Sequence, residues 1–245
     1  MTGLSLSEAD LAGFVVVLAR AAALAQTAPV IGDRSVPAPV RIVAALAMAA
    51  AGAAVRGPVD PARVPALIPL ELAMGLLAGL TARLILLGAE VGGQLIGLQI
   101  GIGLAGQIDP ASGDQALPTR RLLGALAGLA FLGAGGMEAI VRVVAAPTPH
   151  GLTLGALALE IPARAGEVLE LAVRMAAPLI VAGMAVSLGV GLASRGVPSV
   201  NVFSVELVLR AAVALAVLTA CAPTLIADVV GAARRAVDAL GGFSP

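Results

Sequence analysis

Polar side chains inside one long apolar stretch are the first candidates for function. Residues 67–105 are almost entirely apolar, and five charged or amide residues interrupt them: Glu71, Arg83, Glu90, Gln94 and Gln99. A charge in hydrocarbon costs at least about 2.5 kcal/mol on insertion scales, so such residues usually face protein or water. The pattern therefore indicates a membrane helix that does more than span the bilayer.

One face of this helix is polar. Arg83, Glu90 and Gln94 are spaced seven and four residues apart, so they stack on one side, and Gly97 and Gly101 continue that side. Small residues at this spacing let two helix backbones approach closely. Ordinary packing with buried amides explains the glycines. For the three polar residues together we expect an interface with other subunits or a pore.

Three Glu–Arg pairs occur at a spacing of four residues, which places the two charges side by side on a helix. They are Glu138–Arg142, Glu170–Arg174 and Glu206–Arg210. One reading is a proton or ion pathway. The other, which we favour, is that the pairs neutralise each other, ease insertion and dock neighbouring helices.

Enzymatic and metal-binding patterns are missing from the sequence. His150 is the only histidine and Cys221 the only cysteine, so no zinc site of the usual composition is possible. The chain has no lysine, which excludes a phosphate loop ending in lysine. We therefore expect no catalytic residues, no cofactor and no metal.

The composition is that of a polytopic membrane protein. Of 245 residues, 59% are hydrophobic and 12% charged, and the mean hydropathy is +1.03. The net charge is zero, so nothing indicates nucleic-acid binding. We predict an all-α protein whose residues 1–245 form a single integral membrane domain.

About six apolar helical segments, arranged as hairpins, are expected to position the polar residues. They are residues 11–31, 40–55, 66–105, 122–146, 165–193 and 202–230. At about 1.5 Å per residue, the third segment is longer than a hydrocarbon core of about 30 Å. It should therefore tilt, break near Gly92 and Gly93, or stand partly outside the bilayer.

A polar loop of residues 106–118 separates two of the longest apolar segments. Its polar and turn-forming residues are Gln107, Asp109, Pro110, Ser112 and Asp114. Irregular backbone at membrane depth is tolerated only where it is buried in protein or lines a cavity. The loop is therefore either a gate in a pore or a simple solvent-exposed turn.

Several motifs appear along the chain in a fixed order. Near the N-terminus these are Arg20, Ala28-Pro29-Val30 and Pro39-Val40-Arg41, followed by Glu71, Gly75, Gly79 and residues 93–101 of the third segment. Later motifs are Asp109-Pro110, Phe131, Gly135-Gly136, Ala176-Ala177-Pro178, residues 188–195, Pro198, Asn201, Val202 and Phe203. Together they resemble the FliR family, the export-gate subunit of flagellar type III secretion, called SctT in injectisomes.

The resemblance implies a non-enzymatic structural subunit in the bacterial inner membrane, at the flagellar basal body. Its partners would be FliP-like and FliQ-like subunits, a FlhB-like subunit, membrane lipid and unfolded export substrates. Their helical hairpins would form a conical channel, largely lifted out of the bilayer, that the 106–118 loop helps to close. Residues expected at subunit contacts are Arg20, Arg83, Glu90, Gln94, Gly97, Gln99, Gly101, Arg195, Pro198, Asn201 and Phe203.

The alternative function is a small-solute or ion secondary transporter. Intramembrane Glu and Arg residues, and Pro178 as a helix break, would support it. No inverted repeat is visible between the two halves of the sequence, so the export gate remains the preferred interpretation.

Overall fold

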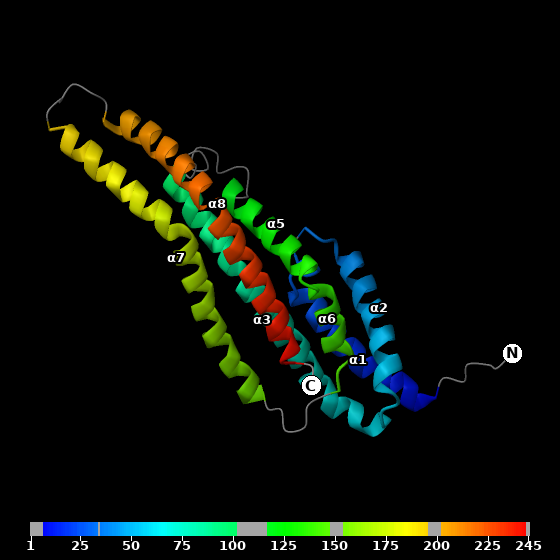
Figure 1. Cartoon of the computed structure of the whole chain (residues 1–245). Helices are drawn as coiled ribbons and strands as arrows, with labels where there is room; N and C mark the ends of the chain where they lie inside the picture. Colours follow the sequence, from blue (N-terminus) through cyan, green and yellow to red (C-terminus); the bar gives the residue numbers. More distant parts are fainter. Residues whose placement is uncertain (1–6, 34, 102–116, 148–153, 196–201, 244–245) are drawn as a thin grey trace. The chain divides into compact units, whose positions relative to one another are not determined.

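The computed structural model describes residues 7–33, 35–101, 117–147, 154–195 and 202–243, and these residues form helices (Figure 1). The predicted all-α class is confirmed. The elements are α1 (Glu8–Thr27), α2 (Ala38–Arg56), a short 3₁₀ helix η1 (Pro61–Arg63), α3 (Val64–Ile100), α5 (Pro118–Gly133), α6 (Gly136–Ala145), α7 (Leu154–Ala193) and α8 (Val202–Gly241).

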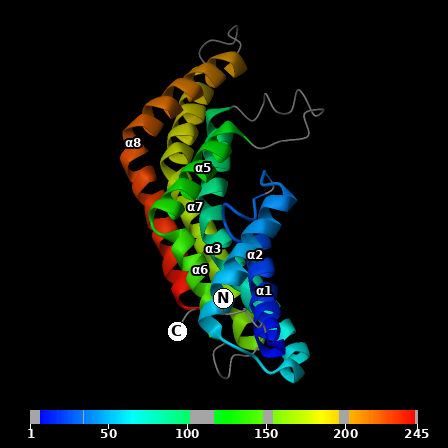
Figure 2. The same cartoon turned by 90° about the vertical axis from the view of Figure 1, so that its right-hand side faces the viewer.

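The chain divides into two compact units, and four of the helices continue from one into the other. The first unit comprises Met1–Ile85, Gly128–Ala165 and Ala233–Pro245, and the second comprises Leu86–Ala127 and Gly166–Ala232. In the first, α1 and α2 lie side by side and α6 packs against both (Figures 1 and 2). In the second, one ion pair and two hydrogen bonds join α7 to α8.

The number of spans is lower than predicted. In the described residues, four helices are long and apolar enough to cross a membrane, or five if α5 and α6 count as one bent span. The expected first span is α1, which is not among them, and it carries the charge of Arg20 near its middle. The expected fourth span is broken: Gly135, at a φ of 87°, separates α5 from α6, and the two helices meet at 62°.

Helix α3 is continuous through Gly92 and Gly93, so of the three alternatives for its length the break does not occur, and tilting or standing partly outside the bilayer stay open. Both glycines serve close packing instead. A Cβ atom on Gly92 would lie 3.2 Å from the Met175 Cβ, and one on Gly93 would lie 2.6 Å from the Thr119 carbonyl oxygen. The helix ends at Ile100, and the next residue, Gly101, has a φ of 89°, a left-handed conformation that glycine adopts most readily.

Helices α7 and α8 are each 40 residues long, more than the sequence pattern suggested. The apolar run that begins at residue 165 is only the second part of α7, which starts at Leu154. Pro178 lies inside α7 and does not end it. The helix break that would have supported a transporter is therefore absent at this residue.

Candidate functional site

A buried ion pair lies at the centre of the first unit. The Arg20 Nε atom of α1 lies 2.5 Å from Oε2 of Glu71 on α3, and both side chains are completely buried. Arg56, at the end of α2, places its Nη2 atom 2.7 Å from the other carboxylate oxygen, with 11% of its side chain exposed. One carboxylate therefore joins three helices through two guanidinium groups. We call these three residues the charged triad.

Arg20 also binds the end of a fourth helix. Its Nη1 group donates to the carbonyl oxygens of Val143 and Ala146 at 2.8 and 2.6 Å. These carbonyls lie at the C-terminus of α6, where the last turn of a helix leaves acceptors unpaired and carries partial negative charge. The planar guanidinium group of Arg20 thus donates to the α6 carbonyl oxygens and to the Glu71 carboxylate at the same time, a geometry that the single ammonium group of a lysine does not offer.

Glycines on α3 allow α1 to come close enough for this arrangement. A Cβ atom on Gly75 would collide with the backbone carbonyl oxygen of Arg20, and one on Gly79 with the Thr27 hydroxyl. The Thr27 hydroxyl in turn donates to the Leu76 carbonyl at 3.2 Å. The four-residue spacing of Gly75 and Gly79 therefore serves packing within this chain.

Two arginines hold the turn between α1 and α2. Arg83 of α3 donates from Nη1 to the Gly32 carbonyl at 2.9 Å, and Arg41 donates from Nη2 to the Asp33 carbonyl at 2.9 Å. The Asp33 carboxylate accepts the Ser35 backbone N–H at 2.8 Å. This hydrogen bond, with help from the nearby arginines, holds the pKa of Asp33 below its usual value of 3.8.

In the second unit, the polar face of α3 meets the start of α5. Glu90 pairs with Arg120, whose Nη2 lies 3.2 Å from Oε2, and Gln94 accepts the Leu117 backbone N–H at 3.4 Å. Gly97 packs against the side chains of Thr119 and Leu117, so closely that a Cβ atom on Gly97 would collide with both. Arg83, Glu90 and Gln94 therefore contact parts of their own chain, as the packing interpretation expected. Their role at an interface with other subunits stays a prediction.

The end of α3 approaches a polar cluster between α7 and α8. Arg210 donates to the Ser187 hydroxyl at 2.5 Å, Ser187 donates to Glu206 at 2.7 Å, and Arg210 lies 3.3 Å from Glu206. A Cβ atom on Gly183 would lie 2.6 Å from the Gln99 amide oxygen. Gln99 thus reaches α7 at the level of this cluster.

Other predicted residues are placed less completely. A Cβ atom on Gly101 would lie 2.9 Å from a methyl group of Leu207. Arg195 is exposed just beyond the end of α7, and Phe203 lies at the start of α8, where only the backbone is described. Pro198 and Asn201 lie outside the described residues, as do the loop residues Gln107, Asp109, Pro110, Ser112 and Asp114.

Two of the three predicted Glu–Arg pairs form. Glu138 and Arg142 lie 2.6 Å apart, both about two-thirds exposed, and Glu206 pairs with Arg210. Arg174 is positioned differently, because it pairs across to Asp228 of α8 at 3.3 Å rather than with Glu170 of its own helix. Of these pairs, only Arg174–Asp228 docks α7 against α8, whereas Glu138–Arg142 and Glu206–Arg210 each lie within one helix.

In this arrangement, ion pairs between side chains of the same chain connect neighbouring helices. Within the described residues, no group of His, Cys, Asp or Glu side chains is placed to hold a metal ion. The sequence matches a family of bacterial export proteins, described as "Bacterial export proteins, family 1", over residues 11–235. The chain belongs to this family.

A characterised relative agrees with this assignment. The chain is 29% identical over 218 residues to the flagellar biosynthetic protein FliR of Escherichia coli strain K12, which covers 85% of this chain and 83% of that protein. The chain is thus a membrane subunit of the flagellar type III export apparatus. Neither these comparisons nor the described part of the chain favours a secondary transporter.

Sequence reasoning missed the partners of Arg20 in this family member. Glu71 was recognised as a charge in an apolar helix, but not as the counter-ion of Arg20, and Arg56 was not considered. A usable signal was present. Single charges of opposite sign in separate apolar segments, such as Arg20 and Glu71, each need a partner, and pairing them satisfies both.

Proposed function

We propose that this chain is a structural, non-enzymatic subunit of the flagellar export gate in the bacterial inner membrane, at the flagellar basal body. It would assemble as a single domain of residues 1–245 with FliP-like and FliQ-like subunits and a FlhB-like subunit. Together they would form the passage through which unfolded export substrates leave the cytoplasm. The family match over residues 11–235 carries this proposal.

The charged triad supports a scaffold rather than a transport cycle. A proton or ion pathway needs groups that exchange protons or ligands with water. Arginine keeps its proton under all physiological conditions, and Arg20 and Glu71 are completely buried. Such a cluster fixes α1, α2, α3 and α6 relative to one another within the first unit.

We place the subunit contacts on residues that the sequence singled out. The set comprises Arg20, Arg83, Glu90, Gln94, Gly97, Gln99, Gly101, Arg195, Pro198, Asn201 and Phe203. Several of these already bind groups of their own chain, so their contribution to assembly would be indirect, through the position of α3. Arg195, which is exposed, is free to contact a neighbouring molecule directly.

We assign the 106–118 loop to closing the gate at rest, with Gln107, Asp109, Pro110, Ser112 and Asp114 as its polar residues. Two features support this role. The loop separates two long apolar segments, and its sequence is too polar and too rich in glycine and proline to continue a membrane helix. A loop can block a pore through its side chains and move aside without breaking a helix.

Deleting the gene from its native host tests the proposal. The deletion strain should be non-motile and should retain flagellar export substrates in the cytoplasm, and the intact gene supplied on a plasmid should restore both. A control strain that keeps this gene but lacks a flagellar protein outside the export apparatus should still secrete the flagellar substrates. Normal secretion of flagellar substrates without this chain would contradict the proposal.

A further inference from the structure

Glu170 of α7 is exposed, and it has no ion pair within the described residues. Arg174, one helical turn further on, places its Nη2 atom 3.3 Å from the Asp228 carboxylate of α8 instead. Asp228 is only 17% exposed, so an Arg174 side chain that turned back to Glu170 would leave a nearly buried carboxylate without a counter-ion. The fold therefore leaves Glu170 unpaired in the part of the chain that the structure describes.

Other acidic residues on the helices are neutralised internally. Five of them have a carboxylate oxygen within 3.3 Å of an arginine nitrogen: Glu71, Glu90, Glu138, Glu206 and Asp228. Glu170, Arg174 and Asp228 together contain two carboxylates and one guanidinium, which leaves one net negative charge on this side of α7. A cation of another molecule can neutralise it.

Exposed apolar side chains continue from Glu170 along α7. The large ones, each about half to two-thirds exposed, are Val173, Val181, Met184, Leu188 and Leu192. With Ala177, which is half-buried, successive members are three or four residues apart, the spacing of a helix face that packs against one other helix. We call Glu170 and these six residues the outer stripe. At about 1.5 Å per residue, it is about 33 Å long.

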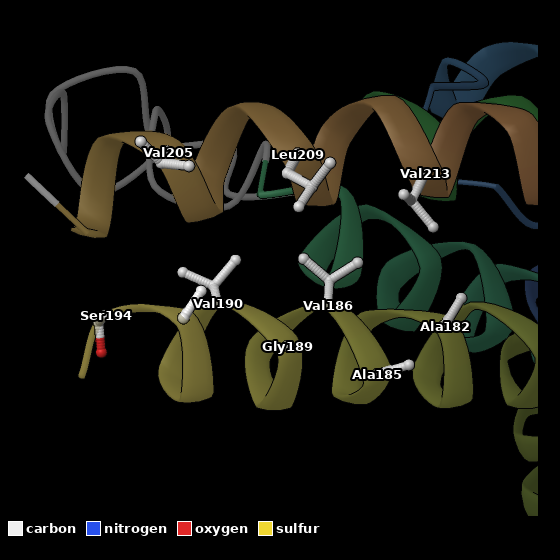
Figure 3. A pocket seen from close by; sticks show the side chains of 10 residues that line it. Ala182, Ala185, Val186, Gly189, Val190, Ser194, Val205, Leu209 and Val213 are labelled. Carbon is white, nitrogen blue, oxygen red and sulfur yellow. The ribbon is translucent and has the colours of Figure 1, made fainter. Parts of the chain in front are cut away.

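The outer stripe lies on the side of α7 that faces away from α8. Figure 3 shows Val186 and Val190 of α7 pointing toward Leu209 of α8, across an apolar groove. Leu188 lies two residues from each of these valines, and at about 100° per residue it points to the opposite side of the helix. Helix α8 therefore does not cover the outer stripe.

Neither water nor lipid suits both parts of the outer stripe. In water, its large apolar side chains form the kind of exposed patch that marks an association site. In hydrocarbon, the unpaired carboxylate of Glu170 would carry a high desolvation cost. A helix with an apolar face and one basic residue opposite Glu170 covers the apolar side chains and neutralises the carboxylate. This holds whether or not α7 lies in the bilayer.

We propose that the outer stripe binds one long helix of another gate subunit, and that this helix presents an arginine or lysine to Glu170. The inference rests on the assembly with other subunits in the proposed function. Glu170 is the only charged member of the outer stripe, so it fixes the register of the bound helix. A shift by one turn, about 5.4 Å, would separate the two charges.

Photo-cross-linking in the assembled complex tests the surface. The chain is co-expressed with the FliP-like, FliQ-like and FlhB-like subunits of its own organism, with benzoylphenylalanine in place of Val181 or Leu188. Irradiation should join both positions to one helix of the same partner subunit, and mass spectrometry of the joined peptides should place an arginine or lysine of that helix at the level of Glu170. Benzoylphenylalanine in place of Val190, which faces α8, should react with its own chain.

Charge reversal tests the ion pair itself. Glu170→Arg should weaken binding of the partner subunit by about tenfold or more, in the range of close charge pairs across interfaces. Reversing the partner's basic residue to glutamate should restore binding to the Glu170→Arg chain. Asp238→Arg, which reverses an exposed acidic residue of α8, should bind as wild type does.

Three results would overturn the inference. The first is cross-linking of Val181 and Leu188 positions to lipid alone or to a second copy of this chain. The second is a joined partner helix without a basic residue near Glu170. The third is normal partner binding by Glu170→Arg. In each case a wild-type hetero-oligomer leaves the proposed function standing, whereas failure of the wild-type chain to form any hetero-oligomer contradicts both.

Discussion

Arg20 and Glu71 form an ion pair whose Nε–Oε2 separation is 2.5 Å, and neither side chain is exposed. The two residues are 51 positions apart and lie on different helices. Because the charged triad contains two arginines and one carboxylate, Glu71 is the member whose loss leaves the most uncompensated charge.

Glu71→Gln should therefore destabilise the protein strongly. Removing one partner of a buried ion pair typically costs about 3–5 kcal/mol, because the remaining charge stays buried without compensation. Here two guanidinium groups would face each other across a neutral amide. We expect the variant to accumulate poorly in the membrane and to melt well below wild type, as measured by thermal unfolding of the purified complex.

Glu138→Gln is the control for that experiment. Glu138 and Arg142 form an ion pair of similar length, but both side chains are about two-thirds exposed. Exposed helical pairs contribute about 0.3–0.5 kcal/mol, so this variant should behave almost as wild type. Equal effects of the two substitutions would show that burial of the charged triad is not what makes it important.

Close packing between α3 and α5 gives a second prediction. A Cβ on Gly93 would lie 2.6 Å from the Thr119 carbonyl oxygen, which is backbone and cannot rotate away. Gly93→Ala should therefore cost about 1–3 kcal/mol, in the range of overpacked cores. Gly191→Ala, at an open helical position, should be neutral or stabilising by up to about 1 kcal/mol. Melting temperatures measured side by side check this order.

The helical class and most helix positions followed from the sequence, because apolar length and periodicity depend on local residue types. The breaks did not. Gly92 and Gly93 were candidates for a helix break. Whether a glycine breaks a helix or allows close packing depends on the residues of the neighbouring helix that face it, here Met175 and Thr119. Gly135, which does separate two helices, could not be told apart from them by local sequence.

The sequence predicted which residues form the polar face of α3, but not which groups those residues contact. Arg83, Glu90 and Gln94 do share the polar side of α3, as their spacing required. Their partners are the Gly32 carbonyl, Arg120 and the Leu117 backbone N–H, which come from distant parts of the chain. Tertiary contacts of this kind are fixed by the arrangement of helices, which spacing within one helix does not encode.

The Asp33 turn predicts a dependence of stability on pH. The pKa of Asp33 is lowered by the Ser35 hydrogen bond, so the ionised carboxylate favours the folded state. This stabilisation is fully present above the unfolded pKa of about 3.8 and is lost as the pH falls through the lower folded pKa. Asp33→Asn should melt below wild type at pH 6, and the difference should shrink below pH 3.8. A difference that stays constant with pH would contradict this assignment.

Shortening the loop tests the proposed gate. Deleting residues 111–115 should leave the complex assembled but make resting membranes permeable to small ions or dyes, because fewer side chains would block the passage. Dye uptake by cells that express the assembled complex measures this effect. Wild-type permeability with assembly intact would reduce the loop to a connector.

Co-purification with the other gate subunits tests the central claim most directly. The chain should be expressed together with the FliP-like and FliQ-like proteins of its own organism, extracted in mild detergent, and analysed by native mass spectrometry. An export-gate subunit should appear in one hetero-oligomer with both partners at a fixed subunit ratio, and Glu71→Gln should lower its yield. A stable homo-oligomer that forms equally well with or without those partners, and never includes them, would contradict the account.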